Sequence, residues 1–184
     1  MSPTKVGIIG CGIAGPVLAI FLKLKGYDPI VYERYESTAD TGLFLSCVTI
    51  PCNCPSLILF LDSLQRNGLL VLAKIPGLVE FIDAYPVDEM HFYSTVEEDQ
   101  GLLGITDYPR KSAASDGLGF RVCPRAKLQR RLAAFAEDAG VPIKWGHRLE
   151  RLQQNDRSVT ATLDRKSTRL NSSHSGESRM PSSA

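Results

Sequence analysis

The chain has 184 residues, of which 43% are hydrophobic, enough for one ordinary globular domain with a substantial core. Its formal net charge of +1 gives no electrostatic reason to expect binding to nucleic acid or to an anionic membrane surface. No secretory signal is visible, and the longest uninterrupted apolar run, Leu57 to Leu61, is too short to span a bilayer. We therefore expect a cytoplasmic protein that binds neither nucleic acid nor membrane.

The first 34 residues have the pattern of a strand, a glycine-rich turn, a helix and a second strand. Lys5 to Gly10 is a short apolar run rich in β-branched residues, which predicts a buried strand of a parallel sheet. The next residues, Gly10-Cys11-Gly12-Ile13-Ala14-Gly15, supply a G-x-G-x-x-G pattern. Apolar residues then recur at helical spacing from about Ile13 to Lys25, and Pro29 to Tyr32 predicts the second strand.

The residue types in this turn suit the binding of a dinucleotide. Gly10 permits the tight turn, Gly12 lets the backbone approach a pyrophosphate, and Gly15 lets the helix pack closely on the strand. The N–H groups and dipole of the helix N-terminus attract phosphate. Glu33 follows the second strand, where its carboxylate can accept hydrogen bonds from a ribose. NAD and FAD share this architecture, so these residues alone do not distinguish them.

The segment from Val6 to Arg34 closely resembles the N-terminus of class A FAD-dependent monooxygenases, the para-hydroxybenzoate or salicylate hydroxylase type. Those proteins extend the glycine pattern with a small residue and a further glycine, matched here by Ala19 and Gly26. They also favour a Glu-Arg pair after the second strand, as at Glu33 and Arg34. The resemblance implies FAD as the cofactor. By this resemblance, its pyrophosphate would be held by Gly10, Gly12, Ala14 and Gly15. Glu33 would hold the adenosine ribose, and Arg34 would lie on the adenine side.

Two later segments resemble the same family. Asn67 and Gly68 match an Asn-Gly pair that opens a helix near the flavin, although the helical spacing after them is equally consistent with core packing. Arg125 and Leu128 match an arginine at the start of a helix with a leucine three residues later. In the family that arginine approaches the flavin, so the resemblance places Arg125 in the flavin region. A solvated charge at a helix end is the alternative.

The resemblance implies an α/β protein, a Rossmann-like FAD-binding fold with part of a mixed β-sheet region, over residues 1–163. By resemblance, NAD(P)H reduces FAD and O₂ supplies a hydroxyl group that is transferred to an aromatic or similar small substrate. The family's later Asp-Gly and Gly-Asp motifs are missing here. We therefore expect the 184-residue chain to be part of such an enzyme and itself inactive. The alternatives are a truncated fragment with at most nucleotide binding and an NAD-dependent Rossmann oxidoreductase. No catalytic side chain is identified.

Two stretches fall outside the resemblance. Residues 46–63 separate segments that are adjacent in relatives, so we interpret them as an insertion, either a retained intron or a real loop. Cys47, Cys52 and Cys54 within it could ligate a metal, but no C-x-x-C pair or fourth ligand accompanies them, so no metal is predicted. Residues 164–184 are polar, serine-rich and without periodicity, which predicts a disordered tail. Most of this tail resembles a translated short-read sequencing adapter.

Overall fold

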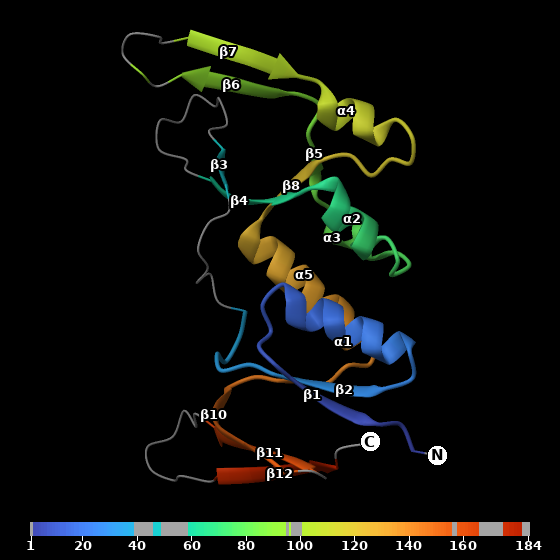
Figure 1. Cartoon of the computed structure of the whole chain (residues 1–184), viewed down its shortest axis with the longest axis vertical. Helices are drawn as coiled ribbons and strands as arrows, with labels where there is room; N and C mark the ends of the chain where they lie inside the picture. The colour runs from blue at the N-terminus through green and yellow to red at the C-terminus, as the bar shows by residue number, and fades with distance from the viewer. Residues whose placement is uncertain are drawn as a thin grey trace. The chain divides into compact units, whose positions relative to one another are not determined.

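The computed structural model describes residues 2–38, 46–48, 59–94, 96, 101–155, 158–165 and 175–181. The chain divides into two compact units, unit 1 comprising Met1–Thr41 and Gln129–Ala184, and unit 2 comprising Gly42–Leu128. Figure 1 shows the helices and strands of both units, with labels on all of them except β9. In the part of the chain that the structure describes, no helix combines the length and the apolar character needed to cross a membrane.

Unit 1 contains a parallel three-stranded sheet in the order β1-β2-β9, with β1 at Lys5–Ile9, β2 at Asp28–Tyr32 and β9 at Ile143–Lys144. Parallel neighbours need a crossover connection, which α1 (Ala14–Leu24) provides between β1 and β2 (Figure 1). Gly26 follows this helix with a φ of +83°, a left-handed conformation that favours glycine and ends the helix. The predicted α/β fold class is thus confirmed.

The core of unit 1 combines this βαβ segment with the helix α5 (Arg125–Asp138), whose residues from Gln129 onward belong to unit 1. Leu132 and Ala136 stand four residues apart on α5, on one face of the helix, and are fully buried. The other buried apolar residues of this core are Ile8, Cys11, Ala19, Ile20, Val31, Ala133 and Val141.

A second sheet of unit 1 is antiparallel, with β10 at His147–Gln154, β11 at Ser158–Arg165 and β12 at Ser175–Pro181. The composition of residues 164–184 predicts a disordered tail, whereas β11 continues through Arg165 and β12 pairs along its length. The physical reason is that the edge of β11 presents backbone N–H and C=O groups, which the backbone of a neighbouring strand can pair.

Unit 2 contains a four-stranded antiparallel sheet in the order β3-β4-β8-β5. Its strands span Ser46–Val48, Leu59–Leu64, Arg121–Pro124 and Tyr85–Pro86, respectively. Strand β3 and all of β4 except Leu64 come from the segment interpreted as an insertion, and β4 pairs with β8. Cys52 and Cys54 of that segment lie outside the described residues.

The continuous helical spacing after Asn67 forms two short helices, α2 (Arg66–Leu72) and α3 (Leu78–Ile82). Pro76 and Gly77 separate them, and Gly77 has a φ of +78° at the N-terminus of α3. The apolar residues of this segment form the core of unit 2, namely Leu69, Leu72, Ile75, Leu78, Val79 and Ile82.

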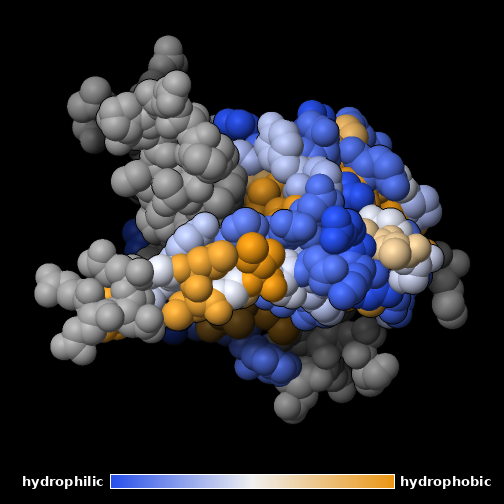
Figure 2. Space-filling model, turned by 90° about the horizontal axis from the view of Figure 1, so that it is seen from above, coloured by the Kyte–Doolittle hydropathy of each residue, from blue (hydrophilic) through white to orange (hydrophobic). Residues whose placement is uncertain are grey.

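Unit 2 also contains the β6–β7 hairpin, formed by Met90–Ser94 and Gly101–Thr106, followed by α4 (Tyr108–Ala113). Within the described residues this hairpin is a two-stranded sheet of its own. Four side chains of the hairpin are at least half exposed, namely Tyr93, Leu102, Leu103 and Ile105. Figure 2 shows hydrophobic surface over the hairpin. Two strands with an uncovered apolar face are marginally stable by themselves in water.

Candidate functional site

The glycine turn between β1 and α1 has the geometry that its sequence pattern predicts. The Gly10 N–H donates to the Tyr32 carbonyl oxygen at 2.8 Å, which joins the end of β1 to the end of β2. Gly10 has a φ of +103°, a conformation that L side chains rarely adopt. A Cβ at Gly15 would overlap the Gly10 carbonyl oxygen, so residue 15 must be glycine for α1 to begin this close to β1.

The N-terminus of α1 is open for a ligand. Ile13 occupies the N-cap, and no described side chain caps the helix by a hydrogen bond. Gly12 and Ala14 are exposed, and a Cβ at Gly12 would meet no atom within 4 Å. The first N–H groups of an α-helix have no partner within the helix, and the helix dipole makes this end attractive to anions. The turn therefore has the features of a phosphate-binding helix N-terminus.

The structure brings Glu33 to this glycine turn, as the sequence predicts. Its side chain is buried, with Oε2 accepting the Cys11 N–H at 2.7 Å and Oε1 accepting the Tyr35 N–H at 3.0 Å. Each carboxylate oxygen thus already accepts a hydrogen bond from a backbone N–H group. A carboxylate has further lone pairs that could accept ribose hydroxyl groups, and the ribose contact stays a prediction.

Arg34 lies next to Glu33 and is exposed. Its Nη2 donates to the Tyr35 hydroxyl oxygen at 2.9 Å, and its guanidinium lies 4.6 Å from the centre of the Tyr35 ring. Arg34 and Tyr35 thus form a cation–π pair on the surface after β2. A contact between Arg34 and an adenine stays a prediction.

Arg125 is the first residue of α5, which confirms that a helix begins there. It belongs to unit 2, whereas the glycine turn and Glu33 belong to unit 1. Asn67 and Gly68 are in the first turn of α2, also in unit 2. The role of Arg125 towards a flavin stays a prediction.

One contact of the turn was not recognised in the sequence. Gln129 Nε2 donates to the Cys11 carbonyl oxygen at 2.8 Å, and the two residues are 118 positions apart. Cys11 itself is fully buried. Burial, together with the negative charges of Glu33 and Glu137, raises the pKa of its thiol to about 12. The Cys11 thiol therefore stays protonated and is no nucleophile near neutral pH.

Unit 2 has a cavity of about 340 Å³ that no sequence signal indicated. Its lining comes from the start of α2, from β6, from α4 and from the segment before β8: Gln65, Arg66, Asn67, Met90, Tyr108, Pro109, Ser112 and Phe120. The lining mixes apolar and uncharged polar side chains with one arginine. This volume is at the lower end of the range of small-molecule sites, about 300–1,000 Å³.

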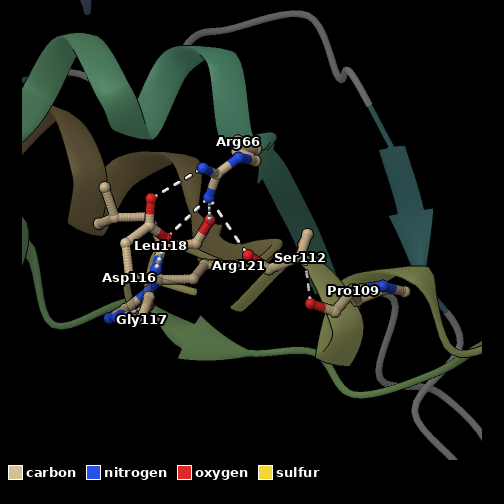
Figure 3. Close-up of polar contacts among 7 residues, drawn as sticks. All are labelled: Arg66, Pro109, Ser112, Asp116, Gly117, Leu118 and Arg121. Atoms are coloured by element: carbon tan, nitrogen blue, oxygen red, sulfur yellow. Dashed lines mark hydrogen bonds and ion pairs between the residues drawn. The ribbon is translucent and has the colours of Figure 1, made fainter. Parts of the chain in front are cut away.

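Arg66, which lines this cavity, makes a network of hydrogen bonds (Figure 3). Its Nη1 and Nη2 donate to the two carboxylate oxygens of Asp116, each at 2.7 Å. Nη1 also donates to the carbonyl oxygens of Ser112, at 3.2 Å, and Leu118, at 3.4 Å. The hydrogen bond from Arg66 lowers the pKa of the Asp116 carboxyl, and the Leu118 N–H lowers it further. The carboxylate of Asp116 thus neutralises the positive charge of Arg66 in the lining of the cavity.

The described residues contain no cluster of three or more histidine, cysteine or acidic side chains that could hold a metal ion. Cys47 is in β3, and the other two cysteines of its segment lie outside the described ranges.

No protein-family model matches the chain. The curated relatives that it matches include Protein FixC of Salmonella typhimurium, 28% identical over 154 residues, which make up 83% of this chain and 31% of FixC. Salicylate hydroxylase asL1 of Sarocladium schorii is 25% identical over 158 residues, with coverage of 83% of this chain and 30% of that protein. The chain therefore spans about a third of the length of these relatives.

Among solved structures, the fold is similar to that of the flavin-dependent monooxygenase PieE in complex with FAD and substrate. The TM-score is 0.67 at 17% identity, and the match covers 98% of this chain and 29% of PieE. At this identity the likeness concerns the fold. Together with the glycine turn, it shows that the chain has the α/β architecture of FAD-binding monooxygenases, in agreement with the resemblance of its sequence.

Proposed function

We propose that the chain is the FAD-binding part of a flavin-dependent monooxygenase that hydroxylates an aromatic or similar small substrate with NAD(P)H and O₂. The observation that carries this proposal is the glycine turn, where Gly15 fits directly against Gly10 and leaves the N-terminus of α1 uncapped. The similarity to a salicylate hydroxylase and to a monooxygenase crystallised with FAD supports it.

The residues of the turn suit distinct parts of FAD. The N–H groups of Gly12 and Ala14 would bind the pyrophosphate, and Gly10 and Gly15 allow the backbone to come close enough for that contact. The Glu33 carboxylate would accept hydrogen bonds from the adenosine ribose. We further assign Arg34 to the adenine side and Arg125 to the flavin region, on the strength of the sequence resemblance. FAD itself would supply the redox chemistry, while the protein binds and orients it.

FAD binding is tested by titrating the purified 184-residue chain with FAD and, separately, with NADH, and following the fluorescence of each ligand. We expect the fluorescence of FAD to be quenched on binding. NAD⁺ added afterwards should not displace the bound FAD. Preferential binding of NADH would instead support an NAD-dependent oxidoreductase. A folded chain that binds neither nucleotide would reject both assignments.

The reaction needs a separate test, because FAD binding alone does not establish oxygen transfer. The measurement is incorporation of ¹⁸O from labelled O₂ into a hydroxylated aromatic product, with NAD(P)H present, by a protein that contains this chain. Substrate-dependent NAD(P)H oxidation without ¹⁸O in the product would contradict the monooxygenase assignment while leaving the FAD site intact.

A further inference from the structure

Gln129 and Glu33 hold the same residue of the glycine turn from two elements of unit 1. Glu33, after β2, accepts the Cys11 N–H at 2.7 Å, and Gln129, on α5, donates to the Cys11 carbonyl oxygen at 2.8 Å. Cys11 is fully buried and Glu33 is 7% exposed, so water has little access to the Cys11–Glu33 hydrogen bond. The two contacts fix the peptide groups on both sides of Cys11.

The contact from Gln129 also determines the direction of the next N–H group. The carbonyl of Cys11 and the N–H of Gly12 belong to one peptide unit, and in a trans peptide these two groups point in opposite directions. The structure contains no cis peptide bond in its described residues. Holding the Cys11 carbonyl towards α5 therefore points the Gly12 N–H away from α5, on the exposed side of the turn.

We infer that Gln129 is a positioning residue of the nucleotide site, which aims the Gly12 N–H at the pyrophosphate by holding the Cys11 carbonyl. In this inference the identity of the ligand rests on the proposed function. The effect of Gln129 on the position of the turn does not. Gln129 contacts the turn through the Cys11 carbonyl, so its effect on nucleotide binding would be indirect.

The first test compares Gln129→Met with the wild-type chain. Methionine has a similar length and volume but cannot donate to a carbonyl, so the packing of α5 is largely kept. We expect FAD affinity to fall about tenfold, the usual effect of losing one hydrogen bond in a site. Gln154→Met is the matched control, because Gln154 is an exposed residue of β10 in the same unit, and its affinity should equal that of the wild type.

Hydrogen exchange read by mass spectrometry separates a local effect from a loss of stability. In Gln129→Met, without ligand, the amides of residues 8–15 should exchange faster, because the turn has lost one of its two anchors. The amides of β10 should exchange at the wild-type rate, since a merely structural role of Gln129 would speed exchange throughout unit 1.

A pH profile provides the second signature. In Gln129→Glu the new carboxyl can donate to the Cys11 carbonyl only when it is protonated. Glu33 and Glu137 are the charged groups that raise the pKa of the Cys11 thiol. Negative charges close to a carboxyl at position 129 would likewise favour its protonated form. FAD affinity relative to wild type should therefore be close to one at low pH and fall as pH rises, whereas the ratio for Gln129→Met should not change with pH.

The outcomes are distinct. Wild-type FAD affinity and unchanged exchange at residues 8–15 in Gln129→Met would overturn the inference. Faster exchange at the turn in a chain whose wild type binds no FAD would support the positioning role and reject FAD as the ligand. Equal acceleration at the turn and in β10 would also overturn it, because Gln129 would then only stabilise unit 1.

Discussion

Gly15 and Gly10 approach each other so closely that a side chain on residue 15 would overlap the carbonyl oxygen of Gly10. The neighbouring Gly12 has free space around the position of its missing Cβ. The two glycines of one motif are thus required for different reasons, Gly15 by the fold and Gly12 by the ligand that is proposed to bind there.

Gly15→Ala should destabilise the protein by about 1–3 kcal/mol, the range for overpacking a tight site. The methyl group must push against backbone, which cannot move aside as a flexible side chain could. The measurement is the free energy of unfolding from urea denaturation, and we expect FAD affinity to fall as well. An alanine variant with wild-type stability would contradict the packing described for this turn.

Gly12→Ala should change the free energy of unfolding by no more than about 0.5 kcal/mol, because the methyl group enters open space. FAD binding should nevertheless be lost, since the same methyl group would occupy the path by which a pyrophosphate approaches the backbone. The two measurements are unfolding in urea and FAD titration. A Gly12→Ala chain that binds FAD normally would argue against a pyrophosphate at this position.

Cys11 should react slowly with thiol reagents at pH 8 while the protein is folded. Its thiol is fully buried and has a pKa of about 12, so very little thiolate is present at that pH. Labelling with iodoacetamide, followed by mass spectrometry of the peptide that contains Cys11, measures this directly. Denatured protein is the control and should be labelled quickly. Rapid labelling of the folded chain would show that the turn opens readily.

Asp116→Asn should lower the midpoint of thermal unfolding at neutral pH but have no effect at strongly acidic pH. In the folded chain Arg66 lowers the pKa of Asp116 from its ordinary value of 3.8, so the carboxylate is favoured in the folded state. The stability that this carboxylate contributes to the folded chain is fully present above pH 3.8. It is lost as the pH falls through the lower pKa of the folded state. Melting curves of both proteins across the acidic range check this. A constant difference down to the lowest pH would exclude the ion pair as the cause.

Leu103→Lys should reduce aggregation without loss of stability. Leu103 is 62% exposed on β7, so the charge enters water and interrupts the apolar face of the β6–β7 hairpin. Light scattering at increasing protein concentration measures the effect, and the free energy of unfolding should change by about 0.5 kcal/mol or less. Leu78→Lys is the contrasting variant, because Leu78 is fully buried in α3 and a charge there should unfold unit 2.

The sequence predicts those parts of the fold that depend on neighbouring residues. The β1–α1–β2 segment and the start of α5 at Arg125 agree with prediction, because apolar periodicity and glycine positions are local signals. The proximity of Glu33 to the glycine turn also follows, since parallel strands joined by one helix end at the same edge of a sheet.

Other features depend on which surfaces meet, and periodicity does not reveal that. On α1, Leu18 and Leu24 are 50% and 61% exposed, whereas Ala19 is fully buried, so hydrophobicity alone does not decide which of its side chains are in the core. The strand β12 pairs with β11 through backbone groups, and amino-acid composition does not predict such pairing. The contacts of Arg66 with Asp116 and of Gln129 with Cys11 join residues 50 and 118 positions apart.

The separation between Gln129 and Cys11 has a consequence for how the protein is made. Glu33 is synthesised only 22 residues after Cys11, so the first anchor of the turn becomes available early. The second anchor arrives 118 residues after Cys11, which at about 5–20 residues per second is a delay of roughly 6–24 s on the ribosome. During that interval the nascent chain has its glycine motif but not the fixed Gly12 N–H. If the turn binds a nucleotide as proposed, we expect it to do so late in synthesis, after α5 has been made and Gln129 can hold the Cys11 carbonyl.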